Sequence, residues 1–330
     1  MKHALPATLV LSLLLAACGS TSGSLTPASS QTLSGTITSL SSDRSALTVA
    51  GTTVKLTASL HALSGATAIR KNGTASTAHA LSVGQNVTVQ ETGGVATEVD
   101  VNVELRGQIS SVGATSLVVA GQTVNVDAGT RIELASDDDT AATAHVLADL
   151  TAGTFVEISG QRDTSGAILA SNIEAKSAEE LHQDGENEDS EVKGEVTNLD
   201  ATAHLFTANG TTVSYDPATV AGTLAPGVAV EVEGQFDAAT AVLRASKVRV
   251  ESDQEEHEGI RAGAVVTVEA RVESMDSASQ TFTARGLTVG YARATVKGQV
   301  TLRAEVKVKG TVDAATPTLI HASTVVVGDD

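Results

Sequence analysis

The chain has 330 residues, which is too long for one ordinary domain and typical of two to four. Aromatic residues make up only 2 % and tryptophan is absent, so any core must be built from small aliphatic side chains. The formal charge of -18 argues against nucleic acid as a partner, because that binding depends on Lys and Arg neutralising phosphates. A single cysteine excludes an intramolecular disulfide.

The N-terminus has the features of an export signal. A positively charged start, Met1-Lys2-His3, precedes an apolar run that ends at Cys18 and is too short to span a bilayer comfortably. Leu15-Ala16-Ala17-Cys18 resembles the bacterial lipobox. That resemblance implies a lipoprotein signal peptide over residues 1–17 and a diacylglycerol on Cys18. The alternative is an ordinary signal peptide with a chance cysteine.

The residues after Cys18 indicate where the mature chain is held. By resemblance to known lipoproteins, the absence of Asp at Gly19 favours the outer membrane, on its periplasmic or surface face. We therefore expect an envelope protein whose contact with the membrane is the lipid on Cys18, since two or three acyl chains anchor stably. Residues 18–32 are rich in Ser, Thr, Gly and Pro and are expected to form a flexible tether.

Three short patterns recur in the same order along the rest of the chain. The first pattern is a Gly followed by alternating apolar and polar residues. The second is a strand, a turn that contains Gly, and another strand. The third is again a Gly followed by alternating apolar and polar residues. The first pattern occurs at Gly35, Gly107 and Gly194, with Ala270 in a fourth copy. The second covers residues 47–54, 117–124, 206–213 and 282–289. The third begins at Gly84, Gly153 and Gly227, and its last copy, at Arg303-Ala304, lacks the Gly.

These copies divide the chain into four units, over residues 33–103, 104–176, 191–251 and 265–330. Alternation of apolar and polar residues predicts five or six short strands in each unit, with one face of each strand buried. Such strands close as a small barrel or curl as a sandwich. We favour an all-β fold of four tandem, small antiparallel β-barrels of the OB-like type. No stretch outside the signal shows convincing helical periodicity with caps.

Two kinds of connecting segment interrupt the pattern. Acidic linkers over residues 177–190 and 252–264 separate the later units, and repulsion between like charges predicts that they are extended. Units one and two carry extra segments, interpreted as loops, that share a Thr-Ala-His-x-Leu motif at His79 and at His145. In unit one, Asn72-Gly73 predicts a further hairpin.

The ordered patterns resemble a bacterial family catalogued as domain of unknown function 5666. The matching residues are the Gly-x-Ile/Val opening, the Leu-x-Val-x-Gly-x-x-Val hairpin, and the Gly-x-x-Val-x-Val strand followed by Gly160, Gly234 or Gly310. The resemblance covers nearly all of residues 33–330 and departs at Ala270 and Arg303, where Gly is missing. It implies tandem small β-barrels in exported, often lipidated proteins, and it supplies no catalytic residues.

Candidate chemistry is sparse in this chain. There is no Gly-x-Ser-x-Gly elbow and no phosphate-binding loop that ends in Gly-Lys-Ser/Thr, so we predict neither enzymatic activity nor a cofactor. Metal ligands are offered by Asp137, Asp138, Asp139 and His145, and by the acidic linkers, although the spacing of a calcium loop is missing. The alternative interpretations are a solvated spacer for the linkers and a polar loop tip for the segment with Asp137.

Four of the six aromatic residues form two pairs at equivalent positions of the repeats. Phe206 and Phe282 align with Leu47 and Leu117 in the hairpin, so we expect them in the core. Tyr215 and Tyr291 follow the hairpin. One tyrosine in each of two units offers little aromatic surface on which a sugar could stack.

Three functions follow as hypotheses. The first is a non-enzymatic, lipid-anchored envelope protein, a string of barrels with structural or binding roles toward an envelope protein or polysaccharide. The second is an envelope module that binds calcium or a small ligand such as a carbohydrate. The third is a hydrolase in the barrel loops around His79 and His145.

Overall fold

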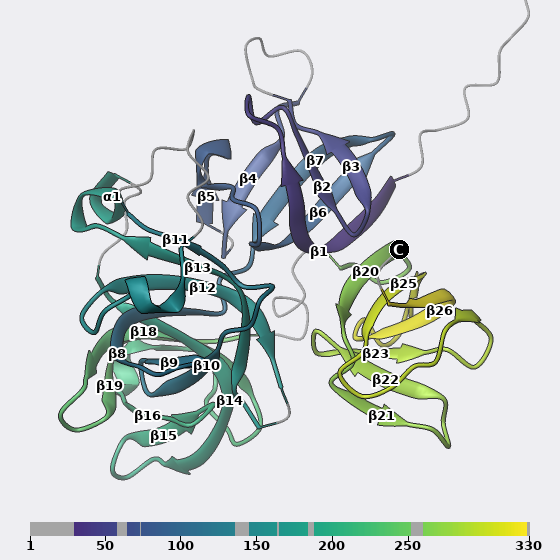
Figure 1. The fold of residues 1–330 in the computed structure, drawn as a ribbon. Coiled ribbons are helices and arrows are strands. Elements are labelled where there is room, and N and C mark those ends of the chain that lie inside the picture. The colour runs from purple at the N-terminus through teal and green to yellow at the C-terminus, as the bar shows by residue number, and fades with distance from the viewer. Residues whose placement is uncertain are drawn as a thin grey trace, which may run out of the picture.

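The computed structural model describes residues 30–57, 65–72, 74–135, 145–163, 165–183, 188–251 and 260–328, where the side chains of residues 182–183 are not described (Figure 1). These residues form four small β-barrels, one in each unit, so the predicted all-β fold is confirmed. The lipidation site Cys18, the signal and residues 18–29 of the tether lie outside the described residues. Within the described ranges, no helix is both long and apolar enough to cross a membrane.

The first barrel shows the plan of all four. Its strand β1 pairs with β2, β2 with β3, β3 with β7, β7 with β6, and β6 again with β1, which closes the barrel. A short hairpin of β4 and β5 follows β3 and joins the same sheet through β7. The strands are β1 (Ser30–Leu40), β2 (Ala46–Val49), β3 (Thr52–Lys55), β4 (Ala68–Lys71), β5 (Thr74–Ser76), β6 (Asn86–Thr92) and β7 (Val95–Val101), with the 3-10 helix η1 (Ala78–Ala80) before β6.

The other three barrels repeat this order. Unit two contains β8 (Leu105–Val112), β9 (Ser116–Val119), β10 (Gln122–Asn125), β11 (Arg131–Glu133), the 3-10 helix η2 (Leu147–Asp149), β12 (Phe155–Arg162) and β13 (Ile168–Lys176). Unit three contains β14 (Ser190–Asp200), β15 (Leu205–Ala208), β16 (Thr211–Ser214), the 3-10 helix η3 (Pro217–Thr219), β17 (Val220–Ala221), β18 (Ala229–Asp237) and β19 (Val242–Val250). Unit four contains β20 (Val265–Arg271), β21 (Ser274–Asp276), β22 (Thr281–Ala284), β23 (Leu287–Gly290), β24 (Thr295–Lys297), β25 (Glu305–Val312) and β26 (Leu319–Val327).

Each barrel also contains parallel pairing, which the antiparallel prediction did not include. The third strand of each unit lies parallel to the last one: β3 with β7, β10 with β13, β16 with β19, and β23 with β26. The short strands β4, β11, β17 and β24 extend this parallel pairing along the same last strand. The loop after the third strand is long enough to cross over before the chain returns, and parallel neighbours require such a crossover.

Strand register confirms that the four repeats are equivalent. In every unit the small residue of the first pattern lies opposite the first Val of the third pattern. The pairs are Gly35 with Val87, Gly107 with Val156, Gly194 with Val230, and Ala270 with Val306. Unit four therefore keeps the register although its Gly is replaced.

The hairpin turns have the two-residue geometry that twisted strands favour. Both central residues have positive φ, for example 47° at Ala50 and 66° at Gly51, and 43° at Asn209 and 87° at Gly210. Positive φ therefore occurs both at the Gly and at the residue before it. This is the type I′ pattern, whose twist matches that of the flanking strands.

The four barrels do not form a string. Units two and three share a twelve-stranded sheet because β8 pairs with β14, and their buried residues form one continuous core. Units one and four share a fourteen-stranded sheet because β1 lies parallel to β20, with Thr32 opposite Val266. Edge strands carry unpaired backbone donors and acceptors, and pairing between barrels satisfies them. The chain therefore folds back, and its last unit lies beside its first (Figure 1).

The first acidic linker contains a short helix where an extended chain was predicted. Helix α1 (Ala178–Gln183) begins after Ser177, whose hydroxyl accepts the backbone N–H of Glu180 at 3.2 Å. The Glu180 carboxylate accepts the backbone N–H of Ser177 at 2.7 Å in return. This reciprocal capping box stabilises the first turn, and Leu181 is buried beneath it.

Candidate functional site

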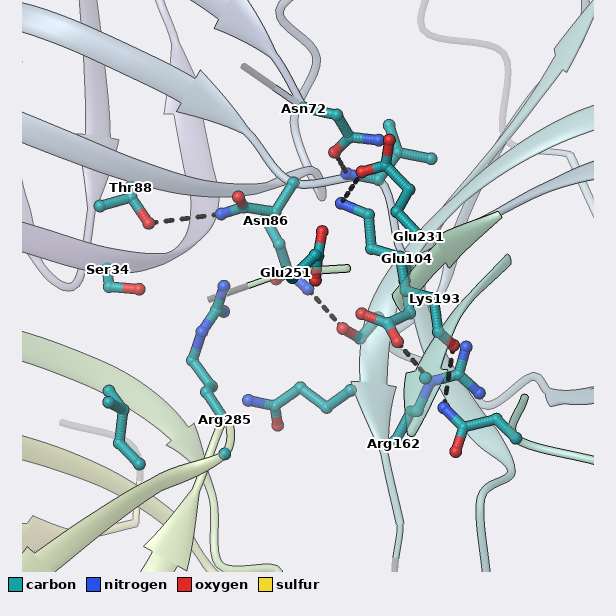
Figure 2. Close-up of a pocket in the computed structure, with 18 of the residues that line it drawn as sticks. Ser34, Asn72, Asn86, Thr88, Glu104, Arg162, Lys193, Glu231, Glu251 and Arg285 are labelled. Atoms are coloured by element: carbon teal, nitrogen blue, oxygen red, sulfur yellow. Dashed lines mark hydrogen bonds and ion pairs between the residues drawn. The ribbon is translucent and has the colours of Figure 1, made fainter. Parts of the chain in front are cut away.

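A polar cavity lies where the four barrels meet. Its volume is about 730 Å³, and residues from every unit line it (Figure 2). Units one and two contribute Ser34, Asn72, Thr74, Asn86, Thr88, Asp100, Gly160, Gln161, Arg162, Asp163 and Gly166, with Asn102, Val103 and Glu104 at their junction. Units three and four contribute Lys193, Gly194, Glu195, Asn209, Glu231, Arg249, Glu251, Glu273, Ser274, Thr283, Arg285, Gly286 and Leu287, and Ile260 precedes unit four. The cavity thus exists only when the units are packed together.

Side-chain amides and hydroxyls make up much of the cavity wall from unit one. Asn86 donates a hydrogen bond to the carbonyl oxygen of Gly160 at 2.6 Å and accepts one from Thr36 at 3.0 Å. Asn102 donates to the Thr88 hydroxyl at 3.3 Å. These bonds hold the amide planes in place, so the wall presents ordered donors and acceptors to the interior.

Unit three contributes a network of opposite charges. The Glu231 carboxylate lies 2.7 Å from the Arg249 guanidinium and 3.7 Å from the Lys193 ammonium. Burial lowers the pKa of Lys193, but the neighbouring Glu191 and Glu231 carboxylates outweigh it, so the net shift of this pKa is upward. Lys193 therefore stays charged, and this side of the cavity is held by fixed ion pairs.

Glu191 lies at the junction of three units. Its carboxylate accepts a hydrogen bond from the Asn72 amide of unit one at 2.5 Å, and its backbone is opposite Arg106 of unit two in the shared sheet. Burial raises the pKa of Glu191 to about 7, because the attraction of Lys193 is opposed by repulsion from Glu231. This carboxyl group changes charge near neutral pH.

The β4–β5 hairpin joins unit one to the units behind it. Beside Asn72, the Lys71 ammonium lies 2.5 Å from the buried Glu157 carboxylate of unit two. Burial raises the pKa of Glu157, but Lys71 and Lys176 outweigh it and lower this pKa overall. The hairpin predicted from Asn72-Gly73 therefore exists, and its tip residues dock on charged partners instead of ending in solvent.

Unit four contributes a charged turn to the cavity. The Glu273 carboxylate accepts the backbone N–H groups of Arg285 at 2.6 Å and Gly286 at 3.3 Å. Burial raises the pKa of Glu273. The Arg285 side chain points into the cavity (Figure 2), and burial lowers its pKa although Glu104 and Glu273 raise it.

Of the four candidate metal ligands in unit two, the structure describes only His145. Asp137, Asp138 and Asp139 lie outside the described residues. The His145 ring nitrogen Nδ1 lies 3.6 Å from Asp149, and His145 is not among the lining residues. Across the part of the chain that the structure describes, no group of three or more His, Cys, Asp or Glu side chains could hold a metal ion.

The shared His motif does not mark equivalent positions. In unit one, Leu81 ends helix η1 and lies three residues before Gly84. In unit two, Leu150 ends η2 at the same spacing from Gly153, whereas Leu147 of the motif begins that helix. His79 is exposed, and neither His79 nor His145 lines the cavity. The two His-bearing segments therefore do not meet there.

Four of the six aromatic residues pack in or against the cores of units three and four. Phe206 and Phe282 are 1 % exposed, as expected from their alignment. Tyr215 and Tyr291 are half-buried and pack on these rings with centroids 5.6 Å apart. None of these four residues is among the described residues that line the cavity.

Sequence reasoning missed the cavity residues because they come from four separate units. The alignment of the hairpin turns carried one available signal. It places Arg285 and Asn209 at the turn position that holds Ala50 and Ala120 in the first two units. The two turns with a polar residue at this position, Asn209 and Arg285, line the cavity, and the two turns with alanine there do not.

The fold and the cavity define a class of protein built from tandem OB-like barrels around a shared polar site. A model of the family described as Domain of unknown function (DUF5666) matches residues 34–100, 106–174 and 193–249, which is more than half of the chain. The chain therefore belongs to this family. The fourth barrel lies outside the matched residues but repeats the strand order.

Two further comparisons add little to this assignment. No curated protein matches the chain. Among solved structures, Drosophila Unr CSD456 is similar, with 12 % identity over 68 % of this chain and 96 % of that chain, and with a TM-score of 0.19. This TM-score is too low to bear on the architecture.

Proposed function

We propose that the protein is a non-enzymatic cell-envelope protein, anchored in the outer membrane through lipid on Cys18, that binds a saccharide segment in the cavity among its four barrels. The observation that carries the proposal is the cavity itself. All four units line it, so together they form a single ligand-binding site.

The lining chemistry supports a saccharide as the ligand. A cavity rich in amides, hydroxyls and charged groups is well hydrated, and an apolar ligand would displace that water without replacing its hydrogen bonds. A saccharide replaces them, because its hydroxyls both donate and accept. Small barrels of the OB type bind oligosaccharides in other proteins, which is an analogy of fold and not evidence of function.

The partners of three cavity carboxylates favour binding over catalysis. Glu104 is paired with Arg162, Glu231 with Arg249 and Lys193, and Glu273 accepts two backbone N–H groups. A carboxylate held by such partners orients a ligand hydroxyl well. A general acid or base instead needs a proton that it can exchange with substrate.

Titration of the soluble mature chain with oligosaccharides of envelope type tests the binding. A saccharide that binds the native state must raise Tm with concentration. We expect such a rise with at least one saccharide and an unchanged Tm in millimolar calcium. A panel of neutral and acidic oligosaccharides without any effect would refute the binding role, and a rise with calcium alone would favour the calcium hypothesis.

Labelling of cells with palmitate tests the anchor separately. The wild-type chain should take up label and fractionate with the outer membrane. The variant Cys18→Ser should take up none. Absence of label on the wild type would refute lipidation and leave the binding experiment unaffected.

A further inference from the structure

Arg285 is placed differently from the other basic residues of the cavity. It is the first central residue of the β22–β23 turn, with a φ of 53°. Its counterpart in unit three is Asn209, with a φ of 43°, whose amide donates to the backbone oxygen of Lys193 at 2.9 Å. In units one and two the counterparts are Ala50 and Ala120, which are fully buried. Unit four alone therefore directs a long basic side chain from this turn.

The Arg285 guanidinium is attracted by the Glu104 and Glu273 carboxylates but is not hydrogen-bonded to either of them. Across the described ranges it makes no hydrogen bond or ion pair, and Figure 2 shows it extending into the cavity away from its own barrel. The nearest carboxylates have other partners, since Glu104 is paired with Arg162 and Glu273 accepts backbone N–H groups of the turn. An arginine side chain has five N–H donors in a planar fork, and here they face the space that a ligand would fill.

The charge around Arg285 restricts which acceptors can use these donors. Carboxylates outnumber basic groups among the lining residues, and the whole chain carries a formal charge of -18. An anionic ligand would be repelled as it entered this negatively charged cavity. The acceptors that fit are hydroxyl or carbonyl oxygens without net charge.

Building on the proposed function, we propose that Arg285 is the specificity-determining residue of the cavity and donates hydrogen bonds to hydroxyl or acetamido oxygens of an uncharged saccharide. The surrounding carboxylates accept the saccharide hydroxyls and disfavour uronic acids. The ligand is therefore a neutral segment of an envelope polysaccharide.

The variant Arg285→Asn tests this role with little disturbance of the fold. Asn tolerates the left-handed backbone of the turn, as Asn209 does in unit three, and it keeps the backbone N–H that Glu273 accepts. The control is Arg293→Asn, which changes an exposed arginine of the same barrel that does not line the cavity.

The measurement is calorimetric titration of the mature four-barrel chain with an N-acetylglucosamine oligomer, a neutral glucose oligomer and an oligogalacturonate. We expect a neutral oligomer to bind the wild type at least about tenfold more tightly than the oligogalacturonate. Arg285→Asn should weaken neutral binding by about tenfold or more, whereas Arg293→Asn should not change it. If Arg285→Asn lowers Tm, Arg285→Lys replaces it, because an ammonium keeps the charge but loses the planar fork.

The outcomes separate the two proposals. Saccharide binding that is unchanged by the Arg285 substitution would overturn the role of Arg285 and leave the proposed function standing. Tighter binding of the oligogalacturonate than of either neutral oligomer would overturn the charge selection. Failure of every saccharide to bind the wild type would overturn the proposed function itself.

Discussion

Replacement of Glu191 by glutamine should stabilise the protein at alkaline pH, and the size of the effect follows from its burial. The Glu191 side chain is 10 % exposed at the junction of three units, and its pKa is raised from 4.5 to about 7. Between these pH values the folded chain holds a proton that the unfolded chain has lost. Stability therefore falls as the pH rises through this window and levels off above about pH 7.

The pKa difference corresponds to a loss of about 3 kcal/mol above pH 7, which Glu191→Gln should restore because Gln carries no charge. The Gln carbonyl still accepts from the Asn72 amide, so the junction is kept. Denaturant unfolding of the mature chain at pH 5 and pH 8 measures the gain, which should be small at pH 5 and near its full value at pH 8.

The control is Glu195→Gln on the same strand, where the carboxylate is exposed, so the free energy of unfolding should change little. An equal effect of Glu191→Gln at both pH values would refute the reasoning. A loss of stability at pH 8 would do the same, because it would show that the ionised carboxylate contributes favourably to the junction.

Three other substitutions test the packing. Arg303→Gly should stabilise unit four by about 1 kcal/mol, because Arg303 has a φ of 66° at a position where the other units have glycine. Gly234→Ala should destabilise by about 2 kcal/mol or more, because its Cβ would lie 2.1 Å from a backbone oxygen, whereas Gly65→Ala meets nothing within 4 Å and should be neutral. Lys71→Ala should cost about 3 kcal/mol by leaving the buried Glu157 carboxylate without its 2.5 Å partner. Thermal unfolding of each variant measures these effects.

Each of these predictions has an outcome that contradicts it. A lower Tm for Arg303→Gly would mean that the arginine side chain contributes more than its backbone strain costs. Equal Tm values for Gly234→Ala and Gly65→Ala would show that the backbone around Gly234 shifts freely to admit a Cβ. For Lys71→Ala the matched control is Arg70→Ala, whose partner Glu98 is 31 % exposed, so a loss of at most about 1 kcal/mol is expected. Equal losses of stability for the two variants would contradict a special contribution of the buried ion pair between Lys71 and Glu157.

The sequence carried enough information for the barrels but not for every element. Repeat alignment located equivalent strands, and the observed register of Gly194 with Val230 and of Ala270 with Val306 agrees with it. The capping-box pattern Ser177-x-x-Glu180 favours helix α1, whereas the like charges that follow it favour an extended chain, and the local cap prevails in the structure. The His79 and His145 motifs were misaligned because a shared string of letters does not guarantee a shared place in the fold.

The amino-acid sequence by itself determined the alternation, the turns and the number of barrels, because these depend on neighbours a few residues apart. Only the tertiary structure decided that β1 pairs with β20 and β8 with β14. The backbone groups on a strand edge are the same in every unit, so local pattern does not reveal which edges meet. The cavity and the position of Arg285 in it depend on that choice, since they arise where separately encoded barrels come together.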